Sequence, residues 1–259
     1  MKRYSKEFFS RIEESAERSA REVVPLVLDL LRPKSVIDVG CGTGNWLAVF
    51  RDLGVEDAWG VDGSYVPKEG RQIPPDRFLE RDLGKPLMLD RRFDLVVSLE
   101  VAEHLPASAA PTFVQSLVGL GPVVLFSAAI PFQGGVHHVN EQWPDYWAEL
   151  FGRHSYVALD CLRKRIWSND KVQWWYAQNI LLFVHTDYTE GHPALRRELE
   201  RATGTQLAIV HPRKYLALAD LRNVSLRNYL ANFPRVFVYG LKRTLENLGR
   251  GKMGSGNGK

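Results

Sequence analysis

Val36-Ile-Asp-Val-Gly-Cys-Gly-Thr-Gly44 is the stretch that decides the fold, because it places three glycines at alternate positions behind a short apolar run. The apolar run predicts a buried strand over residues 35–39, and the spacing of the apolar residues that follow predicts a helix over residues 45–53. Glycines keep side chains out of the turn, and the start of the helix offers unpaired backbone N–H groups. The unit is therefore typical of a site where a ligand approaches the backbone.

Strand and helix patterns alternate along the chain on either side of this unit. Short apolar runs predict strands over residues 35–39, 58–61, 78–79, 93–99, 123–126, 156–162 and 179–184. Helical spacing marks residues 5–31, 45–53, 107–117 and 144–151. This alternation predicts an α/β fold with a doubly wound, mostly parallel, seven-stranded sheet of the Rossmann-like kind, followed by a C-terminal helical extension.

Changes in composition divide the chain into four predicted segments. These are an N-terminal helix over residues 1–34, a ligand-binding domain over 35–186, a basic helical extension over 187–250 and a disordered tail over 251–259. The tail is rich in glycine, which favours disorder. From residue 205 onward the chain has ten basic and two acidic residues, whereas the preceding part has 24 basic and 28 acidic residues. The stretch from residue 205 onward is therefore strongly basic, whereas the part of the chain before it is slightly acidic.

The bulk composition indicates a globular protein, since 45% of the residues are hydrophobic and 25% are charged. The two cysteines, Cys41 and Cys161, offer no disulfide framework, which favours a reducing compartment. The start of the chain lacks the apolar core of a signal peptide, and no apolar run is long enough to span a bilayer. We therefore expect a cytoplasmic protein.

Residue 45 distinguishes two kinds of nucleotide-binding turn. A dinucleotide fingerprint needs a small residue at its third conserved position, which here is Asn45. The turn instead resembles motif I of the class I S-adenosylmethionine (SAM) dependent methyltransferases, in which an acid precedes three alternating glycines. The resemblance extends over residues 35–130, and it implies the methyltransferase form of the Rossmann-like fold with SAM as the cofactor.

The same resemblance implies roles for three acids. Asp38 would order the amino end of SAM, and Asp62 would accept hydrogen bonds from both ribose hydroxyls. Asp82 would accept from the adenine amino group, with Leu83 beside the ring. The predicted cofactor site comprises Asp38, Gly40, Cys41, Gly42, Gly44, Asp62, Gly63, Asp82, Leu83 and Leu99.

A second group of polar residues follows the fourth predicted strand. Glu100, Glu103 and His104 sit at i, i+3 and i+4, so a helical turn would put them on one face. His138 follows the fifth strand, which lies next to the fourth in such sheets. We predict that these four residues bind a divalent cation such as Mg²⁺. Alternatively, they line the pocket without a metal, and His104, His137 or His138 acts as a general base.

This set resembles two families of methyltransferase. Enzymes of the ubiquinone-biosynthesis type have a similar Glu-x-x-Glu-His, and small-RNA 3′-terminal 2′-O-methyltransferases have Glu, Glu, His and a later His followed three residues on by Glu. His138 and Glu141 match that spacing, but Gln142 interrupts the Glu-Trp of the RNA enzymes. We therefore expect methylation of a hydroxyl on a sugar, a glycan intermediate or a small metabolite. RNA 2′-O-methylation and a SAM-binding partner subunit without turnover are the alternatives.

The C-terminal extension combines apolar and basic residues. Between residues 221 and 248, Leu and Phe recur at three- and four-residue steps with Arg and Lys interleaved. This pattern predicts an amphipathic basic helix. Such a helix would either bind an anionic membrane surface peripherally or pack against the domain or a partner protein.

Overall fold

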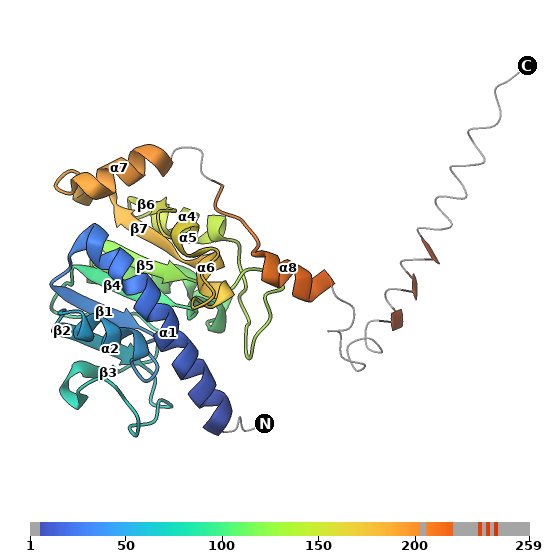
Figure 1. Ribbon diagram of the computed structural model, residues 1–259, viewed down its shortest axis with the longest axis horizontal. Helices are drawn as coiled ribbons and strands as arrows, with labels where there is room; N and C mark the ends of the chain where they lie inside the picture. Colours follow the sequence, from blue (N-terminus) through green and yellow to red (C-terminus); the bar gives the residue numbers. More distant parts are fainter. Residues whose placement is uncertain (1–5, 203–205, 220–232, 235–236, 239–240, 243–259) are drawn as a thin grey trace, which may run out of the picture. The chain divides into compact units, whose positions relative to one another are not determined.

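A computed structural model of the chain describes residues 6–202, 206–219, 233–234, 237–238 and 241–242. Its strands are β1 (Ser35–Val39), β2 (Asp57–Asp62), β3 (Phe78–Glu80), β4 (Leu95–Leu99), β5 (Val123–Ser127), β6 (Tyr156–Leu159) and β7 (Leu181–His185). They form a sheet in the order β3-β2-β1-β4-β5-β7-β6 (Figure 1). Strand β7 runs antiparallel to β5 and β6, and the other pairs are parallel. The predicted mostly parallel, seven-stranded sheet is confirmed.

Helices cover both faces of this sheet. They are α1 (Lys6–Leu31), α2 (Asn45–Asp52), α3 (Ala110–Leu120), α4 (Pro144–Gly152), α5 (Arg163–Ile166), α6 (Trp174–Asn179) and α7 (Pro193–Ala202). A further helix, α8 (Pro212–Ala219), belongs to a second compact unit. Short 3₁₀ helices are η1 (Pro75–Arg77), η2 (Ala102–His104), η3 (Ala107–Ala109) and η4 (Thr186–Thr189). In β1, Val36 packs in one apolar cluster with α1 and α2, whereas Ile37 packs in another with α3 and α4. Because both faces are buried, the strands read as continuous apolar runs.

The carboxyl ends of β1, β4 and β5 meet at one edge of the sheet. The hydroxyl of Ser98 donates to the carbonyl of Val39 at 2.9 Å, and the N–H of Glu100 donates to the carbonyl of Ser127 at 2.9 Å. The order of the strands reverses between β1 and β4, which in open α/β sheets is where ligands bind. The glycine turn after β1 therefore shares this edge with the segments that follow β4 and β5.

The insert between β6 and β7 contains two short helices that the sequence patterns did not predict. The strand expected over residues 156–162 ends at Leu159, because the chain turns into α5. The strand expected over 179–184 begins only at Leu181, because residues 174–179 form α6.

The buried guanidinium of Arg163 connects the insert to a later segment of the chain by hydrogen bonds. The guanidinium of Arg163 donates to both carboxylate oxygens of Asp160 at 2.8 Å. It also donates to the backbone carbonyls of Gln178 and Leu207, at 3.1 and 2.8 Å. The segment 206–211 is thereby held against the same compact unit as the sheet, which ends at His211.

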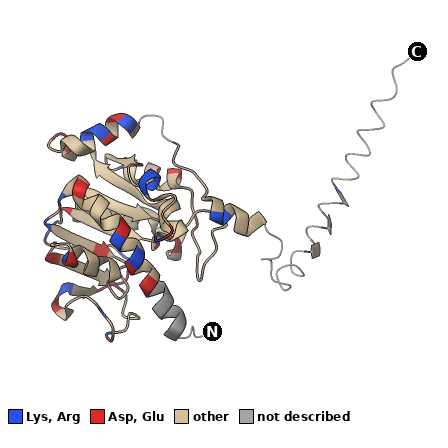
Figure 2. Cartoon of the chain, in the orientation of Figure 1, with Lys and Arg blue, Asp and Glu red and all other residues tan. Residues whose placement is uncertain are grey.

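The second compact unit begins at Pro212 with α8. Most of the predicted amphipathic helix over residues 221–248, and all of the tail over 251–259, lie outside the described residues. In the described part of the first unit, α1 and α7 carry charges of both signs (Figure 2). Among the residues that the structure describes, no helix has the length and apolar character needed to cross a membrane.

Candidate active site

The turn after β1 holds its three glycines in the left-handed region of backbone conformation. Their φ angles are +92° at Gly40, +54° at Gly42 and +92° at Gly44. A side-chain carbon on Gly40 would lie 2.3 Å from Val101, and one on Gly44 would lie 2.3 Å from Ile73, so both positions exclude larger residues. Gly42 faces open space instead, which leaves the backbone of the turn accessible to a ligand.

Two buried carboxylates flank this turn, Asp38 on β1 and Asp62 at the end of β2, and each is 3% exposed. The N–H groups of Gly42 and Gly63 donate to Oδ2 and Oδ1 of Asp62, both at 2.7 Å. Burial, with a further contribution from the charge of Asp62, raises the pKa of Asp38 well above its usual value. A cationic ligand would favour the ionised form of Asp38, and the amino end of SAM is positively charged.

The third predicted acid, Asp82, lies on an exposed turn after β3. The N–H of Gly84 donates to its carboxylate at 3.0 Å, and Lys85 lies 3.3 Å away. The hydrogen bond from Gly84, followed by the contact with Lys85, lowers the pKa of Asp82. Besides the glycines and the three acids, the predicted cofactor site contains three buried apolar residues, Cys41, Leu83 and Leu99.

Glu100 follows β4 in a left-handed conformation, with φ at +56°. Its carboxylate accepts hydrogen bonds from the side-chain amides of Gln133 at 2.9 Å and Asn179 at 3.0 Å. Burial raises the pKa of Glu100, and these hydrogen bonds oppose the rise. The helical turn expected from the i, i+3, i+4 spacing is wrong, because a left-handed residue cannot continue a helix and η2 begins only at Ala102.

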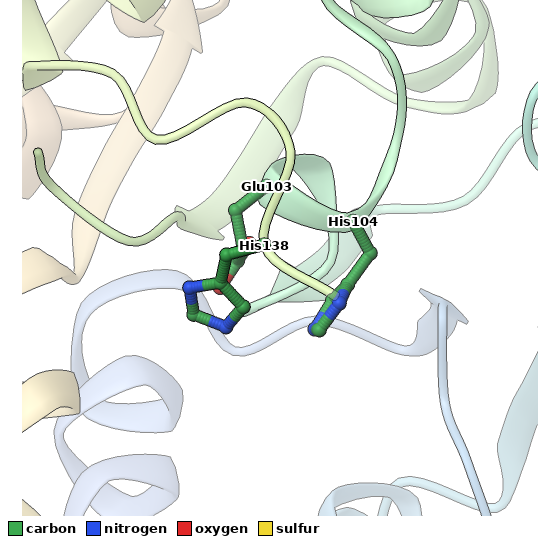
Figure 3. Close-up of side chains that lie close together, drawn as sticks. All are labelled: Glu103, His104 and His138. Carbon is green, nitrogen blue, oxygen red and sulfur yellow. The ribbon is translucent and has the colours of Figure 1, made fainter. Parts of the chain in front are cut away.

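Three side chains converge beside Glu100: Glu103 and His104 from η2, and His138 from the loop after β5 (Figure 3). Their ligand atoms lie within 4.8 Å of one another. Glu103 is fully buried, and the backbone N–H groups of Glu103 and Ala129 are the groups that favour its ionised form. Burial and the neighbouring charge of Glu100 raise the pKa of Glu103 well above its usual value. A buried carboxylate is costly unless its charge is paired, so this arrangement fits a cation.

The loop after β5 positions the two adjacent histidines differently. Nδ1 of His138 lies 2.9 Å from a carboxylate oxygen of Glu141, which orients the ring. The N–H of Val139 donates to the backbone carbonyl of Glu103 at 2.9 Å, so the loop is fixed to η2. His137 is exposed, with φ at +59°, and lies outside the cluster. Of the predicted metal set, Glu103, His104 and His138 are brought together, whereas Glu100 lies beside them.

Residues 12–177, more than half of the chain, match a family model described as a methyltransferase domain. The chain belongs to the class I SAM-dependent methyltransferases. A search of curated proteins finds no match.

Solved structures share the fold of this methyltransferase. The magnesium protoporphyrin IX methyltransferase of Synechocystis with bound S-adenosylhomocysteine (SAH) gives a TM-score of 0.51 at 18% identity, over 72% of this chain and 90% of that chain. The same enzyme with bound SAM gives 0.50 at 18% identity, over 72% and 87%. DesVI of Streptomyces venezuelae gives 0.51 at 15% identity, over 68% and 94%. The agreement at such low identity concerns the fold.

The sequence patterns did not indicate the amide side chains that surround Glu100 in this methyltransferase. The side-chain amide of Gln178 donates to Gln133 at 3.3 Å and to Asn179 at 2.9 Å, and the N–H of His211 donates to Gln178 at 2.8 Å. A buried network therefore connects residue 211 to Glu100. Gln133 and Asn179 lie 33 and 79 positions from Glu100 in the sequence, so no local spacing indicated them.

Proposed function

We propose that this methyltransferase transfers the methyl group of SAM to a hydroxyl oxygen of a sugar, a glycan intermediate or a small metabolite. The observation that carries the proposal is the convergence of Glu103, His104 and His138 at the sheet edge that also holds the glycine turn. The sulfonium of SAM is already a good electrophile, so the enzyme must mainly orient the acceptor and remove its proton. Carboxylate and imidazole groups suit the second task.

The cofactor would bind at the carboxyl ends of β1 and β2. Asp62 would accept from the ribose hydroxyls, and Asp38 would pair with the positively charged amino end. On the acceptor side, burial lowers the pKa of His104, which favours the neutral ring that a proton acceptor needs. His104 takes the hydroxyl proton while the oxygen attacks the methyl carbon, and the carbon–sulfur bond breaks to leave SAH.

The same residues fit a divalent cation, because the carboxylate of Glu103 is fully buried and the imidazoles of His104 and His138 lie beside it. Glu103, His104 and His138 would hold the cation, and His104 would then be a ligand instead of the base. A bound cation would hold vicinal hydroxyls of the acceptor and lower the pKa of the attacking one.

The loop after β5, which carries His138, also carries exposed apolar side chains. Phe132 is 82% exposed, Val136 42% and Val139 64%. Large apolar side chains at such exposure favour contact with an apolar part of a ligand. These residues support an acceptor that presents its hydroxyl next to an apolar group.

The test is incubation of the full chain and methyl-labelled SAM with fractionated cell extract. We expect a labelled product that is stable to mild base, and its loss in Glu103→Gln and His104→Gln. His154→Gln, which changes a histidine next to the first residues of β6, is the matched control and should keep turnover. Label in a base-labile ester or on nitrogen would contradict the proposal. Unchanged turnover in the presence of a chelator would rule out the cation but leave His104 as the base.

RNA 2′-O-methylation is the second candidate, favoured by the contact between His138 and Glu141 at the spacing found in the RNA enzymes. Methylation of a terminal ribose protects the RNA from periodate cleavage, because the vicinal diol is lost. Protection of a small RNA after incubation with SAM and the enzyme would favour this function over the metabolite reaction.

A further inference from the structure

Tyr65 is hydrogen-bonded to Asp62, the carboxylate that the proposed function assigns to the ribose of the cofactor. The hydroxyl of Tyr65 donates to Oδ1 of Asp62 at 2.5 Å, beside the N–H of Gly63 at 2.7 Å on the same oxygen. The other oxygen accepts the N–H of Gly42. A carboxylate offers about four acceptor positions, so three donors leave room for one more. The two ribose hydroxyls cannot both be accommodated while Tyr65 stays in place.

The surroundings of Tyr65 allow it to leave. The residue is 79% exposed, so moving its ring breaks few packing contacts. The ring rests on the backbone of Gly63, where a side-chain carbon would lie only 2.3 Å from it. Gly63 therefore lets the ring of Tyr65 pass close over the backbone, so that its hydroxyl reaches the otherwise buried Asp62.

We propose that Tyr65 is a displaceable plug of the ribose site, whose hydroxyl satisfies Asp62 in the free enzyme and competes with the cofactor. This proposal rests on the proposed contact between Asp62 and the ribose. When the cofactor binds, the ribose hydroxyls replace the phenol hydroxyl and the ring swings into solvent. When SAH leaves, Tyr65 returns, so Asp62 is not left without its side-chain donor.

The competition predicts a gain of affinity when the hydroxyl is removed. Apparent affinity is reduced by the fraction of molecules in which the site is blocked. Tyr65→Phe should therefore bind SAH about fivefold more tightly, the effect of losing one competing hydrogen bond. Titration calorimetry of the full chain with SAH measures this. Tyr188→Phe, which removes a hydroxyl next to β7, is the matched control and should leave the affinity unchanged.

Two further measurements keep the outcomes separate. Asp62→Asn should weaken SAH binding, and if it does not, the ribose contact of the proposed function fails. If Asp62→Asn weakens binding but Tyr65→Phe weakens it too or has no effect, the plug alone is wrong. In the wild-type protein, SAH should accelerate nitration of Tyr65 by tetranitromethane, read by peptide mass spectrometry, and leave Tyr188 unchanged. Slower nitration of Tyr65 in the complex would also overturn the plug.

Discussion

The raised pKa of Asp38 predicts that cofactor binding releases a proton. Its raised pKa means that part of the free protein carries a proton on Asp38 at a pH where an ordinary aspartate is fully ionised. A positively charged ligand selects the ionised form, so binding must release that proton. We therefore expect the affinity for SAM to rise with pH through the raised pKa and then level off. Calorimetric titrations in two buffers of different ionisation enthalpy measure the released proton directly.

Asp38→Asn provides the check on this prediction. The variant cannot ionise, so it should bind SAM at least about tenfold more weakly at the upper plateau, since a charge-assisted contact is lost. It should also show no proton release at any pH. A wild-type affinity that does not change with pH would contradict the assigned role of Asp38.

Among single residues, the positions of the acids at the site could be predicted from the sequence, whereas those of the amides could not. Asp38 and Asp62 lie at the ends of adjacent strands, as their positions behind apolar runs indicated. The left-handed conformation of Glu100 could not be predicted, because it depends on N–H contacts with Ser127 on the neighbouring strand. The convergence of Glu103 with His138 likewise depends on long-range backbone hydrogen bonds between η2 and the loop after β5.

Among the elements, the glycine turn allows a direct comparison of two glycines with similar backbone angles. Gly40 has φ at +92° and no room for a side chain, whereas Gly54 has φ at +98° and open space around it. Alanine at either position costs about 1–2 kcal/mol of stability for the left-handed conformation. Only Gly40→Ala must also displace Val101, so it should abolish SAH binding in calorimetry. Gly54→Ala should bind SAH normally, and loss of binding there would contradict the steric explanation.

Strands that lie between buried layers were predicted well because burial on both sides makes their sequences continuously apolar. The central strands β1, β4 and β5 agree with prediction to within about two residues. The insert between β6 and β7 was predicted less well, because its helices are too short for helical periodicity to appear. The helix α6, Trp174–Asn179, spans under two turns. The predicted strand began two residues too early, at Asn179, because this residue directly precedes the apolar run that forms β7.

At the scale of the whole molecule, Arg163 connects the insert with the segment 206–211. Its side chain is 1% exposed and that of Asp160 is 9% exposed. Arg163→Met would leave Asp160 buried without its partner, which costs about 3–5 kcal/mol. We expect a lower urea midpoint and faster amide hydrogen exchange in residues 206–211. Lys164→Met, at the exposed neighbouring position, should change neither quantity. Equal effects of both substitutions would show that Arg163 does not fasten this segment.

The contacts of Arg163 with Leu207 and of Gln178 with His211 also determine how this chain can be recombined with its relatives. A chimera joined in the polar stretch 187–204 would take residues 207 and 211 from another parent, so the backbone carbonyl and N–H that these two buried side chains require would be placed by a foreign segment. A junction at Pro212 keeps both hydrogen bonds within the parent sequence. Exchange of C-terminal extensions between related enzymes, in the laboratory or during evolution, should therefore preserve the fold when the crossover follows residue 211.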